Sequence, residues 1–165
     1  MSQPDAAKVT AYLCLGSNVG ERAATMDKAL DLMAGAGITV MARSAFYETP
    51  PWGPVPQGPY LNQVVEVETA LPARALLALA LDTERQLGRD RPHEVRFGPR
   101  RIDIDILLFG TEKVADPDLE IPHPRLLERA FALVPLTEIA PDITVGGVRA
   151  ADALARLDRS GIVRL

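Results

Sequence analysis

Hydrophobic residues recur along this chain at two spacings, one typical of β-strands and the other typical of α-helices. Runs rich in strand-forming residues predict extended segments at Val9 to Leu15, Ile38 to Thr49, Tyr60 to Val67 and Arg101 to Phe109. Spacings of three and four residues predict helices that begin near Glu21 and at Pro72, and further helices at Ala130 to Ile139 and Ala151 to Leu157. The first six elements therefore follow the order β-α-β-β-α-β.

That order is typical of a split arrangement in which two helices cover one face of an antiparallel sheet. We therefore expect an α+β fold with a ferredoxin-like core and additional C-terminal helices. The chain has 165 residues, of which 47% are hydrophobic and 24% are charged, so its length and composition suit one globular domain. We expect a single domain that spans residues 1–165.

The second predicted helix carries one charged residue on its apolar side. Its inward stripe consists of Leu76, Leu77, Ala80, Leu81, Glu84 and Leu87. Burying a carboxylate is costly unless a partner compensates its charge. An arginine from the adjacent loop is the simplest partner for Glu84, and an outer-sphere role beside a functional site is the alternative.

Charge and cysteine content narrow the class of protein. A net charge of −4 argues against broad binding to nucleic acid or to an anionic membrane. Cys14 is the only cysteine, which excludes an intramolecular disulfide and a thiol-based zinc cluster, and we expect it to be buried. The N-terminus has no apolar signal segment, and the longest apolar stretch, Ala75 to Leu81, is too short to span a bilayer. We expect a soluble cytoplasmic protein that binds neither nucleic acid nor membrane.

The candidate chemistry lies in an arginine-rich segment and the strand that follows it. Six of the fifteen arginines lie between Arg85 and Arg101, where glycines and prolines exclude a regular helix. Asp103 and Asp105 come next, and alternation along a strand places both carboxylates on one face, with Cα atoms roughly 6.6 Å apart. Such a pair can ligate one or two hard cations such as Mg²⁺, and arginine matches phosphate oxygens. The pattern indicates Mg²⁺ with a polyphosphate, and a solvated acidic face is the alternative.

Five strings of residues occur in an order that is typical of a known family. They are L-G-S-N at Leu15 to Asn18, F-Y-E-T-P-P-W-G followed by Y-L-N, R-F-G-P-R-R-I-D-I-D-I-L, I-P-H-P-R, and L-T-E-I-A-P. Together they resemble the 6-hydroxymethyl-7,8-dihydropterin pyrophosphokinases over most of the chain, and the block R-x-G-P-R-x-x-D-x-D is the most specific. The resemblance implies an enzyme of folate biosynthesis that transfers pyrophosphate from ATP to 6-hydroxymethyl-7,8-dihydropterin, giving AMP and the pterin diphosphate.

The resemblance also implies roles for residues on the phosphate side. Asp103 and Asp105 match the magnesium ligands of the family, in which two Mg²⁺ ions bind with ATP. The residues that match ATP contacts are Arg89, Arg91, Arg100, His123 and Arg129. The first three are also the candidate catalytic residues. No residue stands out as a general base, but phosphoryl transfer depends mostly on positioning and charge neutralisation.

On the pterin side, a flat bicyclic ring suits aromatic faces above and below it and amide groups along its edge. The residues that match pterin contacts are Thr49, Pro50, Pro51, Trp52, Tyr60, Asn62, Phe97 and Phe131. Phe97 stands where some relatives have tryptophan, which leaves less area for stacking. Some relatives carry a lysine in the arginine-rich segment, where this chain has Pro92, His93 and Glu94. By the same resemblance we expect a monomer.

Other functions fit parts of the pattern. Paired aspartates with arginines also occur in metal-dependent hydrolases and nucleotidyltransferases. A pyrophosphokinase would differ from these enzymes by forming AMP only when the pterin is present. Domains of the order β-α-β-β-α-β can also bind RNA by stacking bases on aromatic residues, but the aromatic signature is absent and the net charge is negative. The turn at Leu15 to Gly20 lacks the spacing and the lysine of a P-loop.

Overall fold

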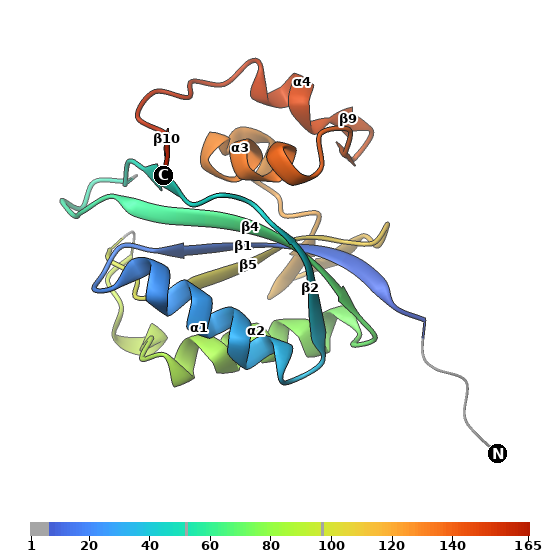
Figure 1. The fold of residues 1–165 in the computed structure, drawn as a ribbon, viewed down its shortest axis with the longest axis horizontal. Coiled ribbons are helices and arrows are strands. Elements are labelled where there is room, and N and C mark those ends of the chain that lie inside the picture. Colours follow the sequence, from blue (N-terminus) through green and yellow to red (C-terminus); the bar gives the residue numbers. More distant parts are fainter. Residues whose placement is uncertain (1–6, 52, 97) are drawn as a thin grey trace.

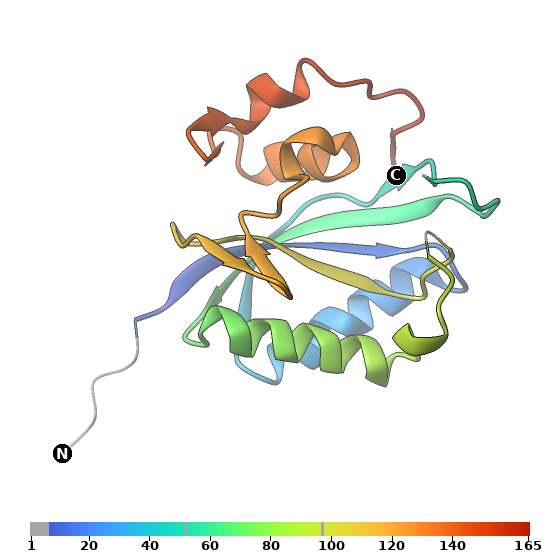
Figure 2. The ribbon, with the colours of Figure 1, turned by 180° about the vertical axis from the view of Figure 1, so that it is seen from behind.

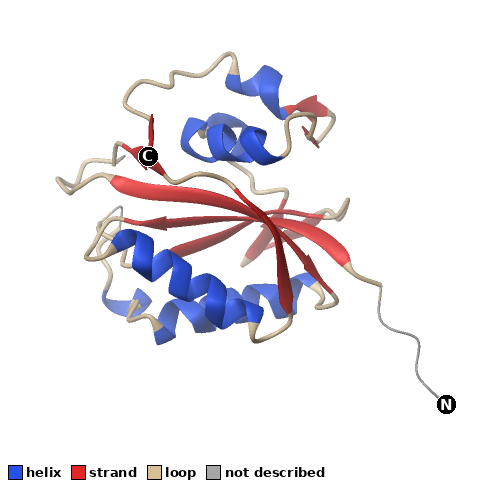
Figure 3. Cartoon of the chain, in the orientation of Figure 1, coloured by secondary structure: helices blue, strands red, loops and turns tan. Residues whose placement is uncertain are grey.

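A central antiparallel sheet separates two layers of helices in the computed structural model, which describes residues 7–51, 53–96 and 98–165 (Figure 1, Figure 3). The strands of this sheet are β1 (Val9–Ser17), β2 (Ile38–Arg43), β3 (Tyr47–Thr49), β4 (Tyr60–Thr69), β5 (Asp103–Phe109) and β10 (Val163–Arg164). The helices are α1 (Arg22–Ala34), α2 (Ala73–Gln86), α3 (Ala130–Ile139) and α4 (Ala150–Leu154), with short 3-10 helices η1 (Arg91–His93) and η2 (Leu126–Glu128). Two small hairpins pair β6 (Val114–Asp116) with β7 (Leu119–Ile121), and β8 (Thr144–Val145) with β9 (Val148–Arg149).

The strand order in the sheet is β10-β3-β4-β1-β5, and β2 also pairs with β4. Each of these pairings is antiparallel. Helices α1 and α2 cover one face of the sheet, and α3 and α4 lie over the other face (Figure 1, Figure 2). The predicted α+β class with an antiparallel sheet is therefore confirmed. Among the described residues, no helix has both the length and the apolar character needed to cross a membrane.

The predicted extended segment at 38–49 is divided into two strands. Ser44 lies in the break between β2 and β3, where its hydroxyl accepts a 3.0 Å hydrogen bond from the backbone N–H of Val64 on β4. The backbone N–H of Ser44 donates in turn to the carbonyl of Val64 at 2.9 Å. A side-chain oxygen therefore takes a place in the hydrogen bonding along β4, and both strands remain paired to β4 on either side of the break.

Alternation along the strands divides the core into two clusters. On β1, Leu13 and Leu15 are buried in the cluster beneath α1 and α2, whereas Cys14 is buried in the cluster beneath α3. The predicted burial of the Cys14 thiol is confirmed. The three isoleucines that flank the aspartates are also buried in the first cluster, as predicted: Ile102, Ile104 and Ile106. Both aspartates consequently face the layer that contains α3.

Some details of the elements differ from the predicted ones. Strand β5 begins at Asp103 rather than at residue 101. Just before it, the backbone N–H of Arg100 donates to the side-chain Oδ1 of Asn18 at 2.8 Å, and the carbonyl of Arg100 accepts from the backbone N–H of Asn18 at 3.0 Å. Helix α4 ends at Leu154 rather than at residue 157, and turns follow it. On α2, only part of the predicted inward stripe is fully covered: Leu76, Ala80 and Glu84 are buried, whereas Leu77, Leu81 and Leu87 are partly exposed.

Candidate active site

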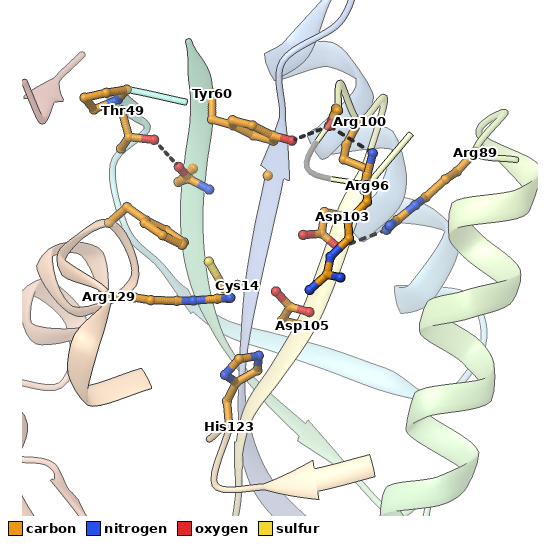
Figure 4. Close-up of a pocket in the computed structure, with 15 residues that line it drawn as sticks. Cys14, Thr49, Tyr60, Arg89, Arg96, Arg100, Asp103, Asp105, His123 and Arg129 are labelled. Carbon is orange, nitrogen blue, oxygen red and sulfur yellow. Dashed lines mark hydrogen bonds and ion pairs between the residues drawn. The ribbon is translucent and has the colours of Figure 1, made fainter. Parts of the chain in front are cut away.

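A pocket of about 280 Å³ lies where β1 ends and β5 begins, between the sheet and the start of α3 (Figure 4). This volume is close to the lower limit for sites that bind small molecules. The lining residues are Cys14, Gly16, Thr49, Pro50, Tyr60, Asn62, Arg89, Arg96, Gly98, Arg100, Asp103, Asp105, His123, Arg129 and Phe131. Most of the residues predicted from the sequence are therefore brought together in one cavity, although they come from distant parts of the chain.

A few predicted residues are not placed in the pocket. Pro51 is half-buried but does not line the cavity. Arg91 belongs to η1, and its side chain lies outside the described part of the structure, as do residues Trp52 and Phe97.

Four lining residues were not predicted: Cys14, Gly16, Arg96 and Gly98. Gly16 belongs to the L-G-S-N string, and alternation along β1 places Cys14 on the same face as Gly16, so the sequence held a signal for both. Arg96 and Gly98 belong to the arginine-rich segment itself.

The two aspartates project from neighbouring positions on one face of β5. Asp103 lies opposite Gly16 and Asp105 lies opposite Cys14 in the pairing with β1. A side chain at position 16 would meet Nδ2 of Asn62 at 2.8 Å, so glycine leaves room for the Asn62 amide to lie against β1. Burial and the charge of Asp103 raise the pKa of Asp105 well above its usual range, which the charge of Arg129 only partly opposes. The pair therefore favours the arrival of positive charge.

Arg89, which lines the pocket, is held by three carboxylates. Its Nη1 donates to Oε2 of Glu84 and to Oδ1 of Asp103, both at 2.9 Å, and its Nε donates to Oε2 of Glu94 at 2.9 Å. Burial alone would lower the pKa of Arg89, but the hydrogen bond with Glu94 and the charges of Asp103 and Glu84 raise it above its ordinary value. The predicted arginine partner of the buried Glu84 is confirmed. Glu84 also accepts a 2.8 Å hydrogen bond from the backbone N–H of Ile104, between the two aspartates.

Arg100 is fixed by the backbone around it. Its Nη1 donates to the carbonyl oxygens of Gly98 at 2.9 Å and of Val95 at 3.1 Å, and its Nε lies 3.5 Å from Oε1 of Glu94. Glu94 thus contacts both Arg89 and Arg100. A shared carboxylate reduces the repulsion between two guanidinium groups, which allows both arginines to line one pocket.

The opposite side of the pocket is aromatic and amide-bearing. The buried hydroxyl of Thr49 donates to Oδ1 of Asn62 at 2.5 Å, which fixes the orientation of that amide. The hydroxyl of Tyr60 lies 3.5 Å from the carbonyl of Gly98, a long contact that links this side to the arginine-rich segment. The guanidinium carbon of Arg129 lies 5.4 Å from the ring centroid of Phe131, within the range of a cation–π interaction.

His123 is a neutral donor at the edge of the pocket. Its backbone N–H donates to the carbonyl of Leu107 on β5 at 2.9 Å. Its Nδ1 accepts a 3.2 Å hydrogen bond from the backbone N–H of Arg125, so the ring proton is assigned to Nε2. Burial and the neighbouring charge of Arg129 lower the pKa of His123 to about 4. The imidazole is therefore uncharged at neutral pH.

The acidic pair fits Mg²⁺ but not a cation that needs a complete cage of side chains. In the described ranges, no group of three or more His, Cys, Asp and Glu residues is arranged to hold a metal. Magnesium is commonly held by one or two carboxylates, with waters and substrate phosphates as the other ligands. Asp103 and Asp105 supply that number of carboxylates at a pocket that also presents arginines to phosphate.

Comparison with known proteins connects this pocket to one family. The model of the family described as 7,8-dihydro-6-hydroxymethylpterin-pyrophosphokinase (HPPK) matches residues 12–141. A Methylorubrum extorquens protein named 2-amino-4-hydroxy-6-hydroxymethyldihydropteridine pyrophosphokinase is 51% identical over 156 residues, which cover 94% of this chain and 98% of that protein. A Bacillus subtilis protein of the same name is 45% identical over 134 residues, covering 81% of this chain and 79% of that protein.

The fold is also similar to that of a solved structure. A crystal structure of Plasmodium falciparum HPPK-DHPS matches with a TM-score of 0.73 at 14% sequence identity. The match covers 92% of this chain and 46% of the Plasmodium chain, so this chain spans less than half of that protein. The match to the family model and the identity to its named members confirm the resemblance that the motifs indicated, and the chain belongs to the 7,8-dihydro-6-hydroxymethylpterin-pyrophosphokinase family.

Proposed function

We propose that this protein transfers the pyrophosphoryl group of ATP to 6-hydroxymethyl-7,8-dihydropterin, giving AMP and the pterin diphosphate for folate biosynthesis. Besides family membership, the composition of the pocket supports the proposal. One half of the pocket is lined by aspartates and arginines, and the other half by aromatic side chains and the Asn62 amide. The first half suits a polyphosphate with its cation, and the second suits a flat heterocycle.

The reaction requires the two substrates to meet in line. The oxygen of the pterin hydroxymethyl group bonds to the β-phosphorus of ATP, the bond from that phosphorus to the oxygen bridging to the α-phosphorus breaks, and AMP leaves. The hydroxyl proton is released in the same overall step. Because this chemistry depends on positioning and on neutralising phosphate charge, the fixed geometry of the pocket residues is the contribution that we assign to the protein.

On the pterin side, we propose contacts from Thr49, Pro50, Tyr60, Asn62 and Phe131. The hydrogen bond from Thr49 sets the direction in which the Asn62 amide meets the edge of the ring. Phe131 and Tyr60 offer aromatic surfaces. Three further pterin contacts stay predictions from the resemblance: Pro51, Trp52 and Phe97.

On the phosphate side, we propose that Arg100 and Arg129 contact the triphosphate, with His123 donating from its neutral ring. Arg89 serves the phosphates from a position fixed by Glu84 and Glu94. A planar guanidinium held at both its Nε and Nη1 atoms loses little further freedom when a phosphate arrives. Arg91 stays a predicted contact.

We propose that Asp103 and Asp105 hold Mg²⁺, with two ions expected alongside ATP. When bound, Mg²⁺ neutralises triphosphate charge and stabilises the charge that develops during transfer at the β-phosphorus. The protein's part is to keep both carboxylates on one face: Ile104 anchors the strand between them, and its backbone N–H is tied to Glu84.

The strand order supports a finer description of the fold. Strand β1 lies between β4 and β5, and the two segments β2 and β3 lie along the far side of β4. This order, with α1 and α2 on one face, supports a ferredoxin-like core that α3 and α4 extend. We further propose that the protein works as a cytoplasmic monomer.

Phosphorus NMR of ATP, Mg²⁺ and the hydroxymethyl-dihydropterin with this protein tests the proposal. AMP and a pterin diphosphate should appear together and in equal amounts. AMP with free pyrophosphate in the absence of the pterin would instead assign the pocket to a hydrolase.

A further inference from the structure

The end of the chain lies behind the proposed pterin side of the pocket. Residues 158–165 return to the outer edge of the sheet, where β10 pairs with β3 (Figure 1). Val163 lies opposite Glu48 and Arg164 lies opposite Tyr47. The backbone N–H of Leu165 donates to the carbonyl of Phe46 at 2.9 Å. The segment is therefore tied to the strand that leads directly into Thr49 and the following proline-rich loop.

Gly161 makes the closest approach between this segment and the pocket wall. A Cβ atom at position 161 would lie 2.7 Å from Cγ and 3.4 Å from Cδ of Pro50. Carbon atoms pack best at about 3.5 to 4.0 Å, so a methyl group would require a movement of about 1 Å. Gly161 also has a φ angle of +80°, which L side chains rarely adopt. Glycine thus allows the segment to touch the Pro50 ring.

The wall that Gly161 touches is thin. A second cavity of about 340 Å³ lies on the other side of it, lined by the C-terminal residues Asp158, Ser160 and Ile162. The residues shared by the two cavities are Thr49, Pro50, Arg129 and Phe131. Pro50 itself lines the pocket, so no packed side chains lie between it and the pocket. If the C-terminal segment displaced Pro50, the pocket wall would therefore move with it.

We propose that Gly161 is a positioning residue for the pterin, which acts by setting the place of Pro50 and, through it, the Thr49 side of the pocket. The inference rests on the proposed function, because that function assigns Pro50 and Thr49 to pterin binding. Displacing a positioning group by about 1 Å can reduce activity by up to roughly 100-fold. The loss should fall on the pterin, because two of the proposed phosphate contacts, Arg100 and His123, do not line the second cavity beside Pro50.

The chain offers a matched control for the backbone strain. Gly147 has a φ angle of +82°, nearly the same as that of Gly161, but nothing lies within 4 Å of its added Cβ. Gly161→Ala and Gly147→Ala therefore impose the same conformational cost, and only the first pushes against Pro50. We expect Gly161→Ala to raise the KM for the pterin by tenfold or more, with the KM for ATP unchanged. Gly147→Ala should leave both constants as in the unmodified protein.

A double-variant cycle tests the route through Pro50. Pro50→Ala removes the Cγ and Cδ atoms that the new methyl group would meet, so adding Gly161→Ala in that background should change the pterin KM far less. If Gly161→Ala alone proves poorly folded, thermal unfolding of the double variant decides: recovered folding supports the contact, and equal loss overturns it.

Two other results overturn the inference: equal pterin KM values for Gly161→Ala and Gly147→Ala, or an equal effect of Gly161→Ala with and without Pro50. Failure of the proposed function is a separate result, because the unmodified protein would then form no pterin diphosphate.

Discussion

The hydroxyl of Thr49 donates a 2.5 Å hydrogen bond to Oδ1 of Asn62, and both side chains are buried at the edge of the pocket. The two residues lie on neighbouring strands, β3 and β4, whose pairing places Tyr47 rather than Thr49 opposite Asn62. The contact is therefore a diagonal one made by the side chains themselves. It orients an amide whose oxygen and nitrogen would otherwise be free to exchange places.

Thr49→Val should weaken pterin binding without changing ATP binding. Valine has nearly the shape of threonine but cannot donate, so it leaves a buried amide oxygen of Asn62 without its partner, at a cost of about 1 to 3 kcal/mol. Steady-state kinetics with each substrate varied in turn measures the two effects separately. Thr49→Ser keeps the hydroxyl and is the control. Equal pterin KM values for the valine and serine variants would show that the hydrogen bond is unimportant.

Asp103→Asn and Asp105→Asn should each nearly abolish transfer while the fold persists, because each change removes a carboxylate charge from the pocket rather than an apolar group from the core. The rate as a function of Mg²⁺ concentration is the measurement, with thermal unfolding as the check on folding. Asp31→Asn alters an exposed carboxylate on α1 and should have no effect. Full activity of either pocket variant at low Mg²⁺ would remove the metal assignment.

Ionisation of Asp105 should lower the free energy of unfolding as the pH rises. An unfolded aspartate has a pKa of about 3.9, and burial beside Asp103 raises the pKa of Asp105 in the folded protein. Its contribution to stability is therefore fully present below the unfolded pKa and is lost as the pH rises through the folded one. His123 has the opposite trend, because its folded pKa is lowered to about 4.

The difference in unfolding free energy between the unmodified protein and Asp105→Asn measures the contribution of the Asp105 carboxylate alone. In urea unfolding without Mg²⁺, Asp105→Asn should become the more stable of the two as the pH rises from about 4 toward neutral. A difference that does not vary with pH would contradict the raised pKa.

Arg100→Ala should reduce kcat/KM by a factor on the order of 10³, as the loss of other arginines that stabilise transferring phosphates does. Arg100→Lys should recover little activity, because an ammonium keeps the charge but lacks the planar fork that Arg100 now directs at backbone carbonyls. The exposed neighbour Arg101 supplies the control, and Arg101→Lys should behave as the unmodified protein. An active Arg100→Lys variant would mean that charge alone suffices.

Glu84→Gln should destabilise the protein and also slow the reaction. The change breaks a buried ion pair with Arg89, which typically costs about 3 to 5 kcal/mol, and it weakens the acceptor of the Ile104 N–H between the two aspartates. Urea unfolding gives the first effect and kcat the second. Glu112→Gln, on the exposed turn after β5, is the control. Unchanged stability of Glu84→Gln would show that this pair is not a structural support.

The main strands and the larger helices could be predicted from the sequence, because the spacing of apolar residues repeats several times within each of them. The small hairpins β6–β7 and β8–β9 and the last strand, β10, were not predicted, since two or three residues hold no measurable period. The division of the segment at 38–49 depends on a hydrogen bond from Val64 to Ser44, twenty residues away, and a local pattern cannot show such a contact.

For the site as well, local patterns in the sequence could be predicted, whereas contacts between distant residues could not. Period-two alternation predicted that Asp103 and Asp105 share a face, and the cost of burying a charge predicted a partner for Glu84. By contrast, the approach of Gly161 to Pro50 joins residues that are 111 positions apart, and only the folded chain reveals it. Cys14 was correctly predicted to be buried, but its place in the pocket was missed, although alternation along β1 puts it on the same face as Gly16 of the L-G-S-N string.

In the proposed reaction, the β- and γ-phosphates of ATP move together to the pterin. ATP labelled separately at the α-, β- and γ-phosphorus, incubated with this protein, Mg²⁺ and 6-hydroxymethyl-7,8-dihydropterin, tests it most directly. We expect the β and γ labels to enter the pterin product at equal rates and the α label to be recovered as AMP. Transfer of the γ label alone, transfer of the α label, or release of the β and γ labels as free pyrophosphate would contradict it.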